Sequence, residues 1–145
     1  MKLKKLVAMT IALLFVQTNF AAHLQDEPNA CPSLSALKSV GLQLVFRDTT
    51  WGWMGISDHQ QYDTNVKWTF GIFIPGQVTD QQDALVKGTA RLAQLDQVQG
   101  PLNMGEHNDN RWGCFYSGGE DNVAIAFTPT LDAQQLMSFA KQFRN

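Results

Sequence analysis

Hydrophobic side chains occupy every second position in several short stretches of this chain, the spacing typical of half-buried β-strands. The longest stretch is residues 65–74, and its alternating apolar side chains are Val66, Trp68, Phe70, Ile72 and Ile74. The same pattern predicts strands at residues 42–48, 51–57 and 98–104. Because Gly100 and Pro101 interrupt the last of these, we expect that strand at an edge of the sheet.

Residues 111–127 predict a β-hairpin. Gly118 and Gly119 supply the turn, and the alternating apolar side chains of the two strands are Trp112, Cys114, Tyr116, Val123, Ile125 and Phe127. The two halves of the chain also look alike, since Trp51-Gly52 and Phe73-Ile74-Pro75 match Trp112-Gly113 and Phe127-Thr128-Pro129. This likeness suggests an internal duplication.

Three stretches have helical spacing instead. The first helix is expected over residues 33–40, starting at Ser33. The second follows a capping box formed by Thr79 and Gln82 and runs to about residue 96. The third is capped by Asp132, with Leu131 stapled onto Leu136; its apolar side chains are Leu136, Phe139, Ala140 and Phe143.

In chain order these elements read α-βββ-α-βββ-α. Short turns join most of the strands, which favours an antiparallel sheet over a parallel one. We therefore predict an α+β fold: a single domain with one antiparallel β-sheet, its helices packed on one face, and one disulfide.

The first residues have the plan of a bacterial secretory signal peptide: Lys2, Lys4 and Lys5, then the apolar residues 6–16, then Ala21-Ala22. The apolar stretch is too short to span a bilayer. We expect residues 1–22 to be removed, residues 23–30 to form a flexible leader, and residues 31–145 to form the domain. The product is expected in the periplasm or outside the cell, without membrane insertion.

Removing residues 1–22 leaves eight basic and thirteen acidic residues, a net charge of −5. Nucleic acids and anionic lipid surfaces attract basic faces, so neither is expected as a partner. The two cysteines, Cys31 and Cys114, are expected to form a disulfide, because exported proteins with an even cysteine count usually pair them. The alternative is a free catalytic or metal-binding thiol.

No stretch has the spacing of a catalytic site or a metal site. Ser57-Asp58-His59 contains the residue types of a hydrolase triad, but adjacent residues cannot face one another as nucleophile, base and orienting group must. The carboxylates of Asp58 and Asp63 in one loop, and of Glu106 and Asp109 in another, are typical of solvated loops. We therefore predict a binding protein and no enzyme.

Two binding modes remain open. Trp51 and Trp53 are flanked by Gly52 and Gly55, and glycine neighbours would leave the indole faces open to a protein or glycan surface. Binding of a small hydrophobic ligand is the other mode.

The leader, the pair Cys31-Pro32 and the late run Cys114-Phe115-Tyr116 resemble the small exported haemin-binding proteins of intracellular Gram-negative bacteria. The resemblance implies haemin as the ligand and assigns no ligand to particular residues.

Haem iron takes axial ligands from His, Tyr, Met or Cys side chains, and the disulfide removes both cysteines. His59 with Tyr62, and Met104 with His107, are each three residues apart and could reach a common face. His59 or His107 is the preferred ligand, with Tyr62 second. Solvation of both histidines on the surface is the alternative.

Overall fold

The computed structural model of the protein describes residues 27–49, 52–105, 110–119 and 121–142. Residues 1–26, which hold the expected signal peptide, lie outside this part. No helix in the described part is long and apolar enough to cross a membrane. Within these ranges, nine elements follow one another in the order α1 (Leu34–Val40), β1 (Leu44–Asp48), β2 (Gly52–Gln60), β3 (Trp68–Ile74), α2 (Gln81–Gln94), β4 (Gln97–Asn103), β5 (Trp112–Ser117), β6 (Val123–Thr128) and α3 (Ala133–Gln142).

The six strands form one antiparallel sheet in the order β1-β2-β3-β6-β5-β4. The predicted α-βββ-α-βββ-α order and the antiparallel sheet are both confirmed. The strand with Gly100 and Pro101, β4, lies at an edge as predicted, and its pairing with β5 shifts register between Gln99 and Leu102.

The sheet consists of two matching halves, β1-β2-β3 and β6-β5-β4, that meet where β3 pairs with β6. Trp53 lies opposite Ile74, and Trp112 lies opposite Thr128. Ile74 and Thr128 both directly precede a proline, so the structure matches Trp112 with Trp53. The sequence comparison, which treated Trp51 as the equivalent of Trp112, was therefore wrong by two residues.

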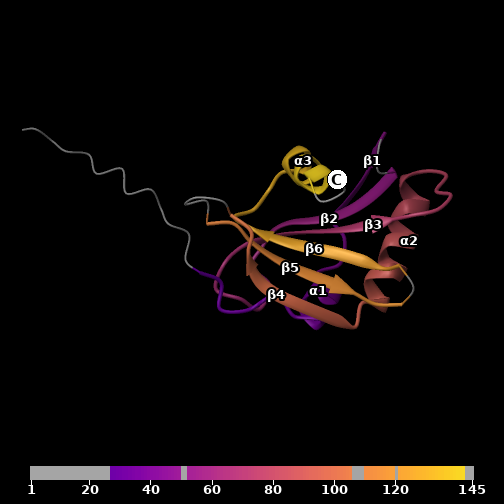
Figure 1. Ribbon diagram of the computed structural model, residues 1–145. Helices are drawn as coiled ribbons and strands as arrows, with labels where there is room; N and C mark the ends of the chain where they lie inside the picture. Colours follow the sequence, from indigo (N-terminus) through magenta and orange to yellow (C-terminus); the bar gives the residue numbers. More distant parts are fainter. Residues whose placement is uncertain (1–26, 50–51, 106–109, 120, 143–145) are drawn as a thin grey trace, which may run out of the picture.

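The helices cover both faces of the sheet, which corrects the prediction that they share one face (Figure 1). Leu37 of α1 and Leu92 of α2 pack with Phe70 on one face, here called the α1/α2 face. Leu136 of α3 packs with Phe127 on the opposite face, here called the α3 face. The central strands are apolar on both sides, so both of their faces need a cover.

Capping side chains fix where each helix begins. Ser33 caps α1 by accepting from the Ala36 N–H, and Asp132 and Gln135 form a reciprocal capping box before α3, which confirms Asp132 as the cap. The α2 cap differs from the prediction, because Asp80 rather than Thr79 accepts the hydrogen bond from the backbone, here from Asp83. The shorter carboxylate of Asp83, not Gln82, reaches back to the Thr79 N–H.

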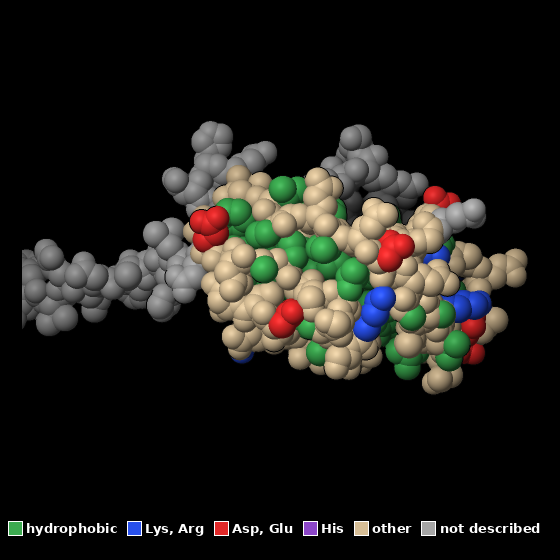
Figure 2. Space-filling model, turned by 90° about the horizontal axis from the view of Figure 1, so that it is seen from below, with side chains coloured by type: hydrophobic (Ala, Val, Ile, Leu, Met, Phe, Trp, Pro, Cys, Tyr) green, Lys and Arg blue, Asp and Glu red, His purple; other side chains and the backbone are tan. Residues whose placement is uncertain are grey.

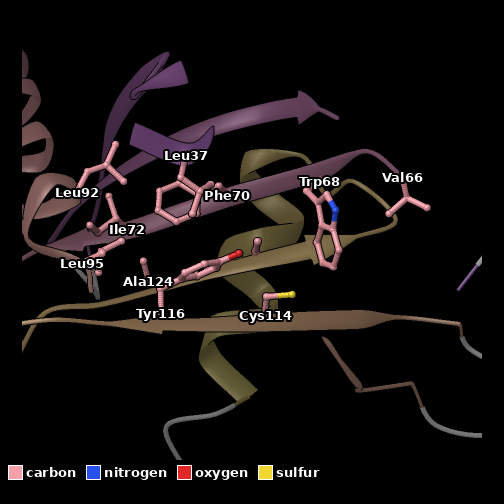
Figure 3. Close-up of a cluster of buried hydrophobic side chains, with 11 residues drawn as sticks. Leu37, Val66, Trp68, Phe70, Ile72, Leu92, Leu95, Cys114, Tyr116 and Ala124 are labelled. Carbon is pink, nitrogen blue, oxygen red and sulfur yellow. The ribbon is translucent and has the colours of Figure 1, made fainter. Parts of the chain in front are cut away.

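The main core lies between the α1/α2 face and its two helices, with side chains from β3 and β5 pointing toward the same side (Figure 3). The predicted disulfide is confirmed: Cys31, just before α1, bonds to Cys114 of β5. The Tyr116 hydroxyl adds a second tie, since it donates to the Pro32 carbonyl oxygen at 2.8 Å. Both ties hold the start of α1 on β5.

Candidate functional site

The end of β2 places Ser57, Asp58 and His59 in different surroundings. Ser57 is fully buried on the α1/α2 face and donates to the Gly41 carbonyl oxygen, whereas Asp58 points to the opposite face. A register irregularity between Ser57 and Gln60 then separates His59 from the regular alternation. Ser57 is therefore separated from the other two, as expected, whereas the Asp58 carboxylate and the His59 imidazole face each other, which corrects the expectation that adjacent residues cannot do so.

Asp58 holds the His59 imidazole instead. The carboxylate Oδ2 lies 2.7 Å from His59 Nδ1, and Oδ1 accepts from the His59 backbone N–H at 2.8 Å and from the Thr69 hydroxyl at 2.5 Å. The Asp58 carboxylate is therefore fixed by β3 and in turn fixes the imidazole. The His59 side chain is 60% exposed, which leaves Nε2 accessible from solvent.

Tyr62, the second predicted ligand, is turned into the core. Its ring packs against the main core cluster, and its hydroxyl is buried without a hydrogen-bond partner in the described residues. The Ser57 hydroxyl lies nearby and donates to the Gly41 carbonyl oxygen, but no hydrogen bond joins it to the Tyr62 hydroxyl. Burial raises the pKa of the Tyr62 phenol, Ser57 opposes this rise and the Asp58 charge adds to it. The phenolate that iron prefers is therefore disfavoured.

Met104 lies on the other side of the sheet from Tyr62. It packs against the core cluster of the α3 face, directly over Gly113. His107 falls outside the described residues, so its predicted pairing with Met104 stays a prediction. The structure does not bring Tyr62 and Met104 together.

Of Trp51 and Trp53, the two residues of the predicted protein- or glycan-binding surface, the structure describes only Trp53. Trp51 lies outside the described residues, and Trp53 is half-buried against Val45 and Ile74 beneath α2. Gly55 does not open the indole face, because Leu42 fills the space beside it: a Cβ there would lie 2.5 Å from Leu42 Cδ1. Trp53 thus packs against the core and is not held open by its glycine neighbour.

Sequence reasoning missed a shallow depression of about 270 Å³ over the ends of β4, β5 and β6. Its lining residues are Gln97, Val98, Gln99, Phe115, Tyr116, Ser117, Val123 and Ala124. The polar residues that alternate along residues 97–99 were a signal for it, but only the pairing of three strands brings them beside Phe115.

The described residues contain no group of three or more His, Cys, Asp or Glu side chains arranged to hold a metal ion. The chain matches no protein-family model, and no curated protein and no solved structure is significantly similar to it. The candidate sites therefore depend on geometry alone.

Proposed function

We propose that this protein is an exported, non-enzymatic binding protein that takes haemin, with His59 as an axial ligand of the iron. The pairing of Asp58 with His59 is the observation that carries the proposal. Histidines that bind metals usually donate their other ring N–H to a carboxylate, which fixes the ring and makes the ligating nitrogen more basic. With Nδ1 held 2.7 Å from Asp58 Oδ2, Nε2 is the nitrogen left for iron.

The surroundings of His59 supply apolar surface for a porphyrin ring. Leu44 of the edge strand β1 pairs with Ile56, which places it diagonal to Asp58 on the same face of the sheet. Leu44 is 48% exposed, and Phe46, two residues further along β1, is half-buried. The exposed His59 imidazole, the exposed Leu44 and the half-buried Phe46 are the groups that support porphyrin binding here.

Of the four predicted iron ligands, His59 is the one that the described geometry supports. Tyr62 is held protonated inside the core and Met104 is packed over Gly113. The sequence resemblance to exported haemin-binding proteins supports the same class of ligand. The alternative site at Trp51 and Trp53 loses support, because Trp53 is packed beneath α2.

Haemin titration of the mature protein, followed through the Soret band, tests the proposal. We expect a saturable shift that weakens by about tenfold or more in His59→Ala and by about tenfold in Asp58→Asn, because Asp58 acts only through the imidazole. Gln82→Ala, at an exposed position on α2, is the control and should bind as the native protein does. A Soret shift that is absent, or that His59→Ala leaves unchanged, contradicts the proposal.

A further inference from the structure

The depression over β4, β5 and β6 lies on the part of the α3 face that α3 leaves uncovered. Leu136 of α3 lies over Gly71 of β3, where an added Cβ would come within 2.9 Å of Leu136 Cδ2. Gly71 pairs with Ile125 of β6, which packs against the same cluster as Leu136, whereas Val123, two residues before Ile125 on β6, is 53% exposed. Seen from below, hydrophobic side chains gather in a band across the molecule, with charged side chains near both ends of the band (Figure 2).

Strand register arranges the side chains of the depression in two rows. Gln97, Ser117 and Val123 pair across the three strands in one row, and Gln99 and Phe115 pair in the next. Ile125, which pairs with Phe115, closes this second row by packing against the core cluster of Leu136. Adjacent strands are about 4.8 Å apart and alternate residues about 6.8 Å apart, so the two rows cover an area of about 10 Å by 7 Å. This area matches one or two sugar rings.

The chemistry of the rows is uncharged and amphipathic. The amides of Gln97 and Gln99 are exposed, and each offers both donors and an acceptor. Phe115 is half-buried between them and Val123, which is 53% exposed. Tyr116 has an ionisable side chain, but it points to the opposite face and donates to the Pro32 carbonyl oxygen.

We propose that this depression binds a short neutral oligosaccharide. A charged ligand would find no opposite charge among the lining side chains, and a wholly apolar ligand would cover the Gln97 and Gln99 amides without pairing them. A pyranose ring satisfies both demands, because its C–H face can lie on Phe115 while its rim of hydroxyls meets the amides. A folded protein partner would bury about 800 Å² of accessible surface on this side, which extends well beyond a depression of two short rows of side chains.

The test uses the ¹⁵N-labelled mature protein and three probes: maltotriose, cellotriose and triacetylchitotriose. We expect at least one probe to give saturable shifts of backbone amide signals at Gln97, Gln99, Ser117 and Val123. Phe115→Ala should weaken this binding by about tenfold or more, because the stacking surface is lost. Val123→Lys should abolish it without touching the core, since a long charged side chain then fills the depression. Val86→Ala, at a 59% exposed position on α2, is the matched control and should leave the binding unchanged.

Three outcomes would overturn the proposal. The first is that no probe gives saturable shifts up to millimolar concentrations. The second is that the shifts occur elsewhere or persist in Val123→Lys while that variant keeps the native spectrum. The third is that the signals of these residues change with protein concentration alone, which would make the surface an interface between two copies. None of these outcomes depends on whether His59 binds haemin.

Discussion

The two faces of the sheet differ in how completely they are covered. On the α1/α2 face, Trp68, Phe70, Ile72 and Tyr116 are each no more than 2% exposed. On the α3 face, Met54 and Phe127 beneath α3 are buried to the same degree, but Phe115 is half-buried and Val123 is 53% exposed. The same alternating strands therefore serve a closed core on one side and an open surface on the other.

The difference arises from which helices are attached to each face of the sheet. The start of α1 is held on β5 by the Cys31–Cys114 disulfide and by the Tyr116 hydrogen bond to Pro32, while α2 packs across β1, β2 and β3. The other face has α3 over its central strands. Both proposed binding sites flank α3, with His59 toward β1 and the oligosaccharide site toward β4. Stability is thus expected to reside on the α1/α2 face and ligand contact on the α3 face.

The sharpest test of this division compares two phenylalanines on opposite faces. Phe70→Ala should lower the free energy of unfolding by about 3–5 kcal/mol, because it leaves a cavity in a sealed core. Phe115→Ala should cost about 1 kcal/mol, since its half-exposed ring loses less burial. Urea denaturation of both variants measures the difference. Equal losses would show that the open surface is as important for stability as the core.

Removing the disulfide tests the tie that closes the α1/α2 face. Cys31 and Cys114 are 83 residues apart, and the double variant Cys31→Ala, Cys114→Ala should lose about 2–4 kcal/mol of unfolding free energy, the typical loss when a disulfide is removed. Hydrogen exchange should accelerate first in α1, whose start the bond holds. Equal acceleration in α1 and α3 at the same denaturant concentration would contradict a role specific to this face.

Much of the fold could be predicted from local patterns. The alternation in residues 65–74 gave a central strand, Asp132 marked the start of α3, and the cysteine pair predicted the disulfide. The face chosen by α3 could not be predicted, because helical spacing shows which side of a helix is buried and not which sheet face it meets. Leu136 fits over Gly71, a contact between residues 65 positions apart in the chain.

The candidate sites were predictable only in part. His59 was named from its chemistry, but its tie to Asp58 depends on a strand irregularity that no sequence pattern marks. Tyr62 has a left-handed backbone (φ 53°), which directs a predicted surface ligand into the core, and nothing in the residue type signals this conformation. Gln99 and Phe115 lie side by side because of the register between β4 and β5, and the sequence does not specify that register.

The smallest expected effect distinguishes two tyrosines associated with the main core. Tyr116→Phe should lower the free energy of unfolding by about 1–2 kcal/mol, because the buried Pro32 carbonyl loses its donor. Tyr62→Phe should leave it unchanged or raise it slightly, since that hydroxyl is buried and finds no hydrogen-bond partner among the described residues. Urea denaturation at neutral pH measures both. A loss in Tyr62→Phe as large as that in Tyr116→Phe would show that the Tyr62 hydroxyl has a partner.

The pH dependence of the same variants provides a second readout. Burial raises the pKa of both phenols in the folded state, whereas an unfolded tyrosine ionises near pH 10. Above about pH 10 the unfolded chain therefore loses protons that the folded chain keeps, and the stability present below that pH falls as pH rises. Each Tyr→Phe variant removes one such group, so each should lose stability less steeply with pH than the native protein does. A slope that neither substitution changes would mean that both phenols ionise in the folded protein as they do in water.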